Sequence, residues 1–99
     1  MLNVKKTVEG SSACLALEGR LDTTTAPQLE KELKALSGVT ELTLDMTALE
    51  YISSAGLRVL LGQHKVMAGK GSMKLTHVNE LVQEVFDVTG FSDILTIEG

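Results

Sequence analysis

The strongest constraint on the fold is the alternation of two hydrophobic spacings along the chain. Over 2–8, 13–17 and 39–46, apolar residues tend to alternate with polar ones, as in a strand with one buried face. Over 29–36 and 57–67, apolar residues recur every three or four positions, which is typical of an amphipathic helix. Strands that alternate with helices favour parallel pairing of the connected strands, with the helices packed on the sheet.

These spacings predict a single α/β domain over residues 1–99, with a mixed sheet flanked by helices. We expect strands over 2–8, 13–17, 39–46 and 73–77, helices over 25–36, 54–67 and 80–89, and a short C-terminal strand over 94–97. The turn EGSS makes the first two strands a hairpin, and 19–25 is expected to be a loop. The order is therefore ββαβαβα followed by the short strand.

The helix boundaries carry their own signals. Thr25 and Gln28 have the spacing of a capping box for the first helix, and Asn79 is a suitable N-cap for the third. The apolar stripe of the third helix is expected to consist of Leu81, Val82, Val85 and Phe86. In the second helix, Val59 and Val66 lie outside the main apolar face, so we expect that helix to be buried on more than one side.

Composition and charge argue against several classes of function. The net charge is −4 and the nine Lys and Arg residues are scattered. Binding to nucleic-acid phosphates requires Lys and Arg side chains that are clustered on one surface. No apolar run approaches the eighteen or so residues of a membrane span. We therefore expect a soluble, cytoplasmic protein with no nucleic-acid partner.

The chemistry of an enzyme is hard to assemble from this sequence. His64 and His77 are the only residues whose ordinary side-chain pKa would let them serve as a base near neutral pH. Both are interpreted as structural residues. The chain lacks a nucleophile-elbow pattern and a phosphate-binding glycine motif, and one cysteine with two separated histidines does not make a recognisable zinc site. Asp22 and Asp45, at expected strand ends, are interpreted as capping residues. We expect a protein that is not an enzyme and holds no cofactor or metal.

The segment DMTALEYISSAGLRVLL, residues 45–61, raises a question that composition does not answer. Two serines, Ser53 and Ser54, open an apolar helix whose unpaired backbone N–H groups need only one hydroxyl cap. The next residues, Ala55 and Gly56, are small, and small residues allow a partner to approach the backbone closely. The residues alone leave open whether the serines form a cap or a docking surface.

Four segments occur in an order that resembles a bacterial family. They are GRLD at 19–22, D-x-T-x-x-x-Y-I-S-S-A-G-L-R-V-L-L at 45–61, the glycine-rich loop before Met73, and VFDVTGF at 85–91. Together they resemble the anti-sigma factor antagonists, the bacterial members of the STAS domain family. The resemblance covers the chain from about Val4 to Ile97, and its central segment is the specific part. The family's fold, a sheet flanked by helices, is compatible with the order of elements expected here.

The resemblance implies a switch protein. Unphosphorylated members bind an anti-sigma factor that is also a serine kinase, and so release the sigma factor. The kinase phosphorylates a serine at the start of the central helix, and a PP2C-type phosphatase reverses the reaction.

The family motif D-S-[ST]-G, aligned on Gly56, makes Ser54 the expected phosphorylation site and Ser53 the alternative. Ser54 is also the serine that we expect to cap the helix. Ser53 stands where the family has aspartate, and Ala55 removes the third-position hydroxyl. The resemblance also places Asp45 near the acceptor loop and implies that Asp22 contacts the partner. The partner-binding residues expected on this basis are Asp22, Thr23, Thr24, Thr47, Tyr51, Ser53, Ser54, Gly56, Leu57 and Arg58.

The replacement of aspartate by Ser53 favours an alternative function. In this alternative the chain is a STAS interaction module that is never phosphorylated, for example a subunit of a phospholipid transporter or a signalling scaffold.

Overall fold

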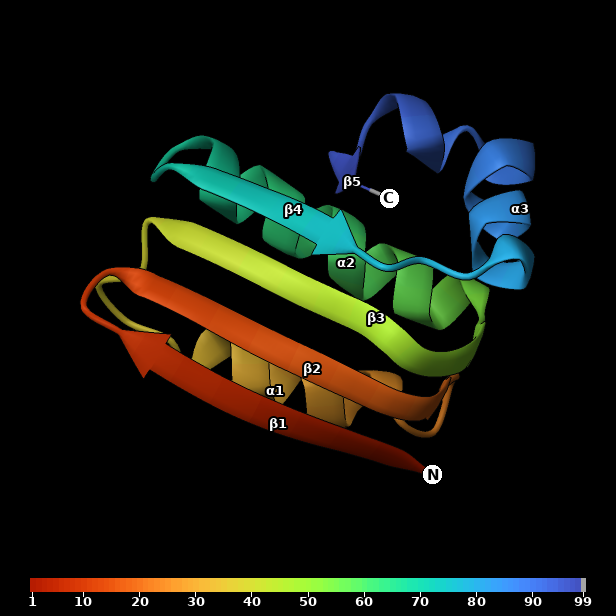
Figure 1. Ribbon diagram of the computed structural model, residues 1–99, viewed down its shortest axis with the longest axis horizontal. Coiled ribbons are helices and arrows are strands. Elements are labelled where there is room, and N and C mark those ends of the chain that lie inside the picture. The colour runs from red at the N-terminus through yellow and green to blue at the C-terminus, as the bar shows by residue number, and fades with distance from the viewer. Residues whose placement is uncertain (99) are drawn as a thin grey trace.

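The computed structural model describes residues 1–98 as one mixed sheet with helices (Figure 1). Its elements are β1 (Leu2–Glu9), β2 (Ser12–Leu21), α1 (Ala26–Lys34), β3 (Glu41–Ile52), α2 (Ser54–Ala68), β4 (Ser72–Thr76), α3 (Glu80–Thr89), the 3-10 turn η1 (Phe91–Asp93) and β5 (Ile97–Glu98). The expected ββαβαβα order with a short last strand is confirmed, but the strand begins only at Ile97, and Ile94 ends the 3-10 turn.

The five strands lie in the sheet in the order of the sequence. β1 pairs with β2 in antiparallel fashion, whereas β2, β3, β4 and β5 are parallel to their neighbours. The N-terminal hairpin and the parallel pairing of the middle strands are as predicted.

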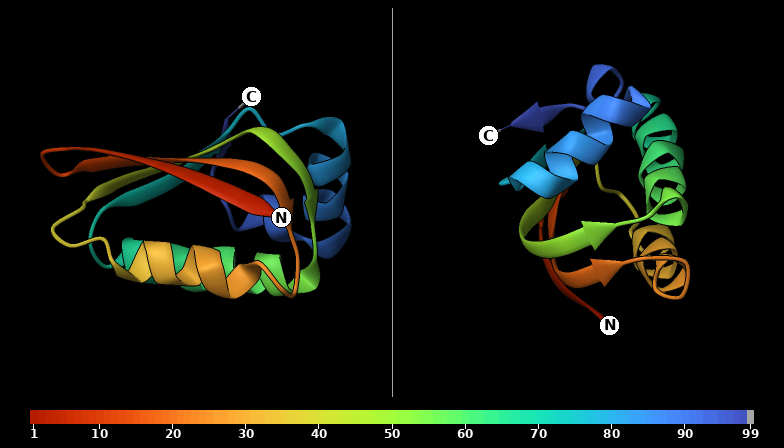
Figure 2. Two further views of the ribbon diagram at one scale, coloured as in Figure 1. Left: turned by 90° about the horizontal axis from the view of Figure 1, so that it is seen from below. Right: turned by 90° about the vertical axis from the view of Figure 1, so that its right-hand side faces the viewer.

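The two faces of the sheet have different surroundings. α1 and α2 lie side by side on one face, and α3 lies at the end of the molecule where β3 finishes (Figures 1 and 2). The side chains that point toward the helices are mostly leucines, such as Leu15, Leu44 and Leu75, and they are fully buried with Leu60 and Phe86. The burial of this aliphatic surface stabilises the fold, because transfer of apolar area out of water is favourable.

β2 and β3 are longer than predicted, and the expected loop 19–25 is wrong in its first half. β2 continues to Leu21 and β3 continues to Ile52, so Asp45 lies within β3 and not at its end. The register of the β2–β3 pair shifts twice, because Ala16 and Glu18 oppose Asp45 and Ala48 while Gly19 and Arg20 oppose Leu49 and Tyr51. β3 therefore holds two more residues than β2 over the same span, as β-bulges do.

The expected capping box of α1 is not formed. The Thr25 hydroxyl donates a hydrogen bond to the Arg20 carbonyl at 2.8 Å and accepts one from the Asp22 N–H at 2.8 Å. Gln28 donates its amide N–H to the Leu2 carbonyl at 2.8 Å. Both side chains join strand ends to the helix: Thr25 bonds the end of β2 and Gln28 bonds the start of β1, so neither side chain caps the helix.

α3 follows the prediction at both ends but not along its whole apolar stripe. The Asn79 side chain accepts the Val82 N–H at 2.8 Å, and Gly90 ends the helix in the left-handed conformation. Val82 and Phe86 are buried, whereas Leu81 is 55% exposed. α2 follows expectation only in part, because Val59 packs partly buried against the core whereas Val66 is 47% exposed.

Two glycines of α2 provide a matched test of this packing. A Cβ on Gly56 would lie 2.7 Å from Leu21 Cγ and 2.9 Å from Ile52 Cγ1, whereas a Cβ on Gly62 would meet nothing within 4 Å. We expect Gly56→Ala to lower the free energy of unfolding by about 1–3 kcal/mol through overpacking. Gly62→Ala should raise it by up to about 1 kcal/mol through helix propensity. Urea unfolding followed by circular dichroism measures both; equal stability of the two variants would contradict this account of Gly56.

Candidate functional site

The serines lie where two strands end and two helices begin. β2 leads into α1 and β3 leads into α2 at the same end of the sheet (Figure 2). The Ser53 N–H donates to the Leu21 carbonyl at 2.9 Å, which joins the end of β3 to the end of β2. This bond holds the Asp22 loop and the start of α2 next to each other.

The two serines have different structural roles, and the expected assignment of the cap is wrong. Ser53, not Ser54, is the N-cap: its backbone is extended and its Oγ accepts the Gly56 N–H at 3.5 Å. Ser54 is the first residue of α2 and is exposed. Because the cap is provided by its neighbour, the Ser54 hydroxyl is available at the helix N-terminus.

Gly56 and Leu57 do not form part of the exposed surface. Both are buried, and the close approach that Gly56 permits is to Leu21 and Ile52 within the same chain. The expectation that Gly56 leaves room for a partner is therefore corrected: it lets the first turn of α2 pack onto the ends of β2 and β3.

The Asp22 loop is ordered by its own hydrogen bonds. Asp22 Oδ1 accepts the Thr24 hydroxyl at 2.7 Å and the N–H groups of Thr24 and Thr25 at 3.0 and 3.1 Å. These bonds, the Thr24 hydroxyl first, hold the pKa of Asp22 below its usual value against the opposing effect of desolvation. Asp22 thus presents a carboxylate at neutral pH, with Thr23 exposed beside it.

Arg20, which the sequence analysis did not select, links this loop to the end of β3. Its guanidinium carbon lies 4.4 Å from the centre of the Tyr51 ring, and its Nε lies 4.0 Å from Asp22 Oδ2. An arginine above an aromatic face is attracted to the ring. The residue was missed because 19–25 was interpreted as a loop; as a strand position that opposes Tyr51, its role follows from the register.

Asp45 and Thr47 lie on the opposite face of the sheet from α1 and α2, so the predicted position of Asp45 near the acceptor loop is wrong. The strand alternation directs Leu44 and Met46 to the helices and these two residues away from them. Asp45 Oδ1 accepts both the hydroxyl and the N–H of Thr47, and it lies 3.6 Å from His77 Nδ1. These contacts, the Thr47 hydroxyl first, lower the pKa of Asp45.

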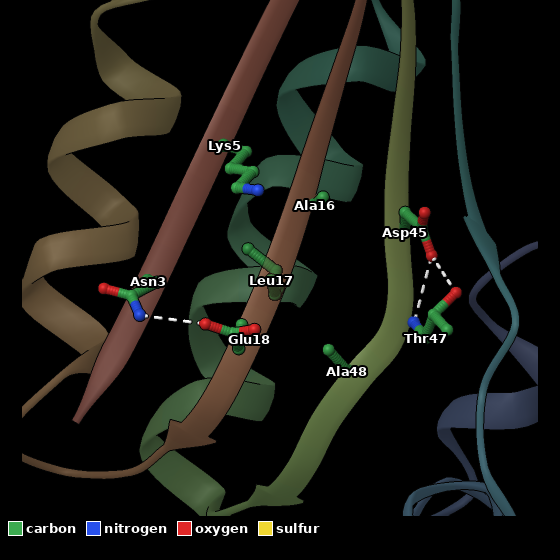
Figure 3. Close-up of a pocket in the computed structure, with 8 residues that line it drawn as sticks. All are labelled: Asn3, Lys5, Ala16, Leu17, Glu18, Asp45, Thr47 and Ala48. Atoms are coloured by element: carbon green, nitrogen blue, oxygen red, sulfur yellow. Dashed lines mark hydrogen bonds between the residues drawn. The ribbon is translucent and has the colours of Figure 1, made fainter.

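The same open face carries a shallow hollow of about 180 Å³. Figure 3 shows it above Ala16, between β1 and β3, with Lys5 pointing into it. Asn3 donates a hydrogen bond to Glu18 at 3.0 Å on one side, and the Asp45–Thr47 pair lies on the other. The hollow is separate from the two serines.

Within residues 1–98, no three His, Cys, Asp or Glu side chains gather as a metal ion would require. In the same range, no helix combines the length and the apolar character needed to cross a membrane.

Comparison with known proteins places this chain in a family. The family model described as "Mlab, STAS domain" matches residues 4–96, and the chain belongs to the STAS domain family. Among curated relatives it is similar to BtrV of Bordetella bronchiseptica, named as a candidate anti-sigma factor antagonist, with 40% identity over 86% of this chain and 74% of the relative. It is 32% identical to the anti-sigma-B factor antagonist of Bacillus subtilis, over 82% of this chain and 76% of the relative.

Solved structures agree on the fold. An anti-sigma factor antagonist from Mycobacterium paratuberculosis aligns with a TM-score of 0.88 at 18% identity, over 98% of this chain and 85% of that one. The anti-sigma factor antagonist SpoIIAA in its unphosphorylated form aligns with a TM-score of 0.76 at 18% identity, over the whole of this chain and 88% of that one. At such identities the likeness shows the STAS fold.

The division of roles between the serines can be measured as stability. We expect Ser53→Ala to lower the free energy of unfolding by about 0.5–1 kcal/mol, at the low end of cap losses because the bond to the Gly56 N–H is long. Ser54→Ala should change it by less than about 0.5 kcal/mol, as for other exposed positions. Urea unfolding of the two variants tests this; a larger loss from Ser54→Ala would reverse the assignment of the cap.

The Asp45–Thr47 contact predicts a pH dependence. The pKa of Asp45 is lowered in the folded chain from the usual 3.8, so the contact stabilises the fold above that value and loses its effect as pH falls through the lowered pKa. Thr47→Val removes the hydroxyl. We expect the wild type to be more stable than Thr47→Val at neutral pH, with the difference shrinking below about pH 4. Urea unfolding across this pH range measures it, and a difference that grows on acidification would contradict the sign.

Proposed function

We propose that this chain is a cytoplasmic anti-sigma factor antagonist that is controlled by phosphorylation of Ser54. The unphosphorylated form binds an anti-sigma factor with serine-kinase activity and frees the sigma factor, and a PP2C-type phosphatase restores the bare serine. The chain is then a binding protein and not an enzyme. The names of the relatives support the general function, and the exposed Ser54 beside a separate capping serine supports the switch.

The proposed contact surface follows from exposure and position. It consists of the Asp22 loop, the Tyr51 end of β3 and the outer side of the first turn of α2, with these residues: Asp22, Thr23, Thr24, Tyr51, Ser53, Ser54 and Arg58. Gly56 and Leu57 support this surface from beneath, since both are buried. Thr47 is left out because it lies within β3 on the face away from α1 and α2, five residues before Ile52 ends the strand.

A phosphate on Ser54 would be tolerated by the fold. It adds a charge of about −1.5 to −2 and three acceptor oxygens at the start of a helix. The helix dipole and the unpaired N–H groups of the first turn favour an anion there. Arg58 is exposed and lies about one helical turn further on, within the range of side-chain pairing. The effect is therefore on the surface: a partner fitted to an uncharged hydroxyl meets charge and bulk.

Ser53 alters the charge next to the acceptor. In relatives with aspartate at this position a carboxylate would precede the acceptor serine, whereas here the neutral hydroxyl of Ser53 accepts the Gly56 N–H. Asp22, held ionised on the adjacent loop, is then the carboxylate of the proposed surface. We infer that the partner kinase recognises Asp22 and does not require an acid before the acceptor.

The alternative function is a STAS interaction module without phosphorylation, such as a phospholipid-transporter subunit or a signalling scaffold. The observation that favours it is the missing acid at Ser53. Neighbouring genes separate the two: a kinase and a phosphatase support the switch, and transporter subunits support the module.

The test uses kinase-type anti-sigma factors encoded with the chain, ATP, and phosphate mapping by mass spectrometry. We expect one phosphate on Ser54 in the wild type and in Ser53→Ala, and none in Ser54→Ala. Phosphate on neither serine, together with no binding to such a kinase, would refute the proposal.

Binding of the same partner provides a second measurement. Ser54→Asp should weaken binding by about thirtyfold or more, because an uncompensated charge in an interface costs about 2 kcal/mol or more. Val8→Glu is the control: it adds one negative charge at a half-exposed position of β1 outside the proposed surface, and should leave binding within about threefold. Circular dichroism establishes that both variants are folded. Retained binding by Ser54→Asp would favour the unphosphorylated module.

A further inference from the structure

α3 exposes an apolar ridge that its own fold does not cover. Leu81, Val85 and Val88 recur at the four- and three-residue spacing of one helical side. Leu81 is 55% exposed and Val88 is 80% exposed, while Val85 is partly buried against the core. Isolated exposed leucines are normal on a surface, but an aligned set on one helix is characteristic of a contact surface.

The ridge of α3, defined by these three residues, is flanked only by negatively charged side chains. Glu80, Glu84 and Asp87 lie on the same helix, and the sequence from 78 to 98 contains no Lys, Arg or His. A segment that would cover the ridge must therefore offer apolar surface together with positive charge.

The groove between α1 and α2 is a surface of that kind. Two adjoining hollows of about 210 and 250 Å³ share Leu33, Lys34, Gln63 and Val66. Lys70 lines the first hollow and Arg58 the second, and the acid of the groove, Glu30, lies 3.6 Å from Lys34. The groove of α1 and α2 thus has an excess of positive charge on a chain whose net charge is −4.

Gly62 keeps this groove open. It lies within α2 and lines the groove, and a Cβ built on it would meet no atom within 4 Å. A glycine in a helix interior costs about 1 kcal/mol relative to alanine. Packing within the chain does not explain a glycine at position 62, because a larger residue would fit there. Position 56 differs, since a Cβ built on Gly56 would collide with Leu21 and Ile52. A side chain of another molecule can therefore enter the space above Gly62.

We propose that the ridge of α3 of one molecule docks into the groove of α1 and α2 of a second copy of this chain. Apolar side chains meet apolar walls, and the acids of α3 face Lys34, Lys70 and Arg58. The two surfaces are different, so the contact is head-to-tail. Any open assembly keeps one free ridge and one free groove at its two ends and can grow there, unless it closes into a ring. The contact is small and partly electrostatic, so it weakens as added salt screens the charges.

Sedimentation velocity of the wild-type chain, from micromolar to millimolar concentration, tests the proposal. We expect the average mass to rise beyond that of a dimer with concentration and to fall when salt is added. Val88→Glu adds charge to the ridge, and Gly62→Leu fills the groove without a clash at its Cβ. Each should weaken association by about tenfold or more, which corresponds to about 1.4 kcal/mol. Val8→Glu, at a half-exposed position that belongs to neither surface, should associate as the wild type does.

The decisive sample is an equimolar mixture of the two variants. Val88→Glu retains an intact groove and Gly62→Leu retains an intact ridge, so the mixture should form a one-to-one heterodimer that does not grow further. Circular dichroism establishes that both variants are folded. A wild type that stays monomeric, variants that associate like the wild type, or a mixture that stays monomeric would each overturn the proposal. A monomeric wild type whose Val88→Glu form loses binding to an anti-sigma factor would assign the ridge to that partner. None of these outcomes depends on phosphorylation of Ser54.

Discussion

The junction of β2, β3 and α2 is the constraint on which the site depends. The Ser53 N–H bonds the Leu21 carbonyl, and one residue later the chain turns into a helix whose first turn lies on Leu21 and Ile52. Gly56 permits that approach, since any larger residue would push the helix away from the strand ends. With the helix start fixed in this way, Ser54 must point outward, and the loop that carries Asp22 must lie beside it.

The sequence predicted the architecture well because most elements repeat a simple period. Leu42, Leu44 and Met46 mark one face of a strand, Leu29 and Leu33 mark one side of a helix, and Asn79 and Gly90 mark the ends of α3. The failures concern polar side chains, whose partners depend on the backbone geometry and not on residue type or spacing. Thr25 and Gln28 have the spacing of a capping box, yet they bond the ends of β2 and β1. Ser53 and Ser54 are equal candidates for a cap by residue type, and only the backbone geometry distinguishes them.

The electrostatics of the site also could not be predicted from residue types alone. Asp22 was recognised from the resemblance, but the reason for its ionised state lies in the Thr24 hydroxyl and in N–H groups that the turn directs toward it. Arg20 became significant only when the register placed it opposite Tyr51. Without the strand register, the sequence predicts only a loop over residues 19–25. In the structure these residues form an ordered surface between two strand ends.

The two bulges of β3 have a consequence for how this segment tolerates changes of length. The buried positions step by two along Leu42, Leu44 and Met46, and then by three to Leu49 and by three again to Ile52. One extra residue would turn the last part of the strand over, and the second restores its original facing, because side chains alternate between the two faces. Deletion of one residue between Met46 and Ile52 would therefore direct Ile52 away from the core and launch the following helix from the wrong side of the sheet. The direction in which Ser54 points therefore depends on whether the number of extra residues between Met46 and Ser53 is even or odd. That number matters more than which residues they are.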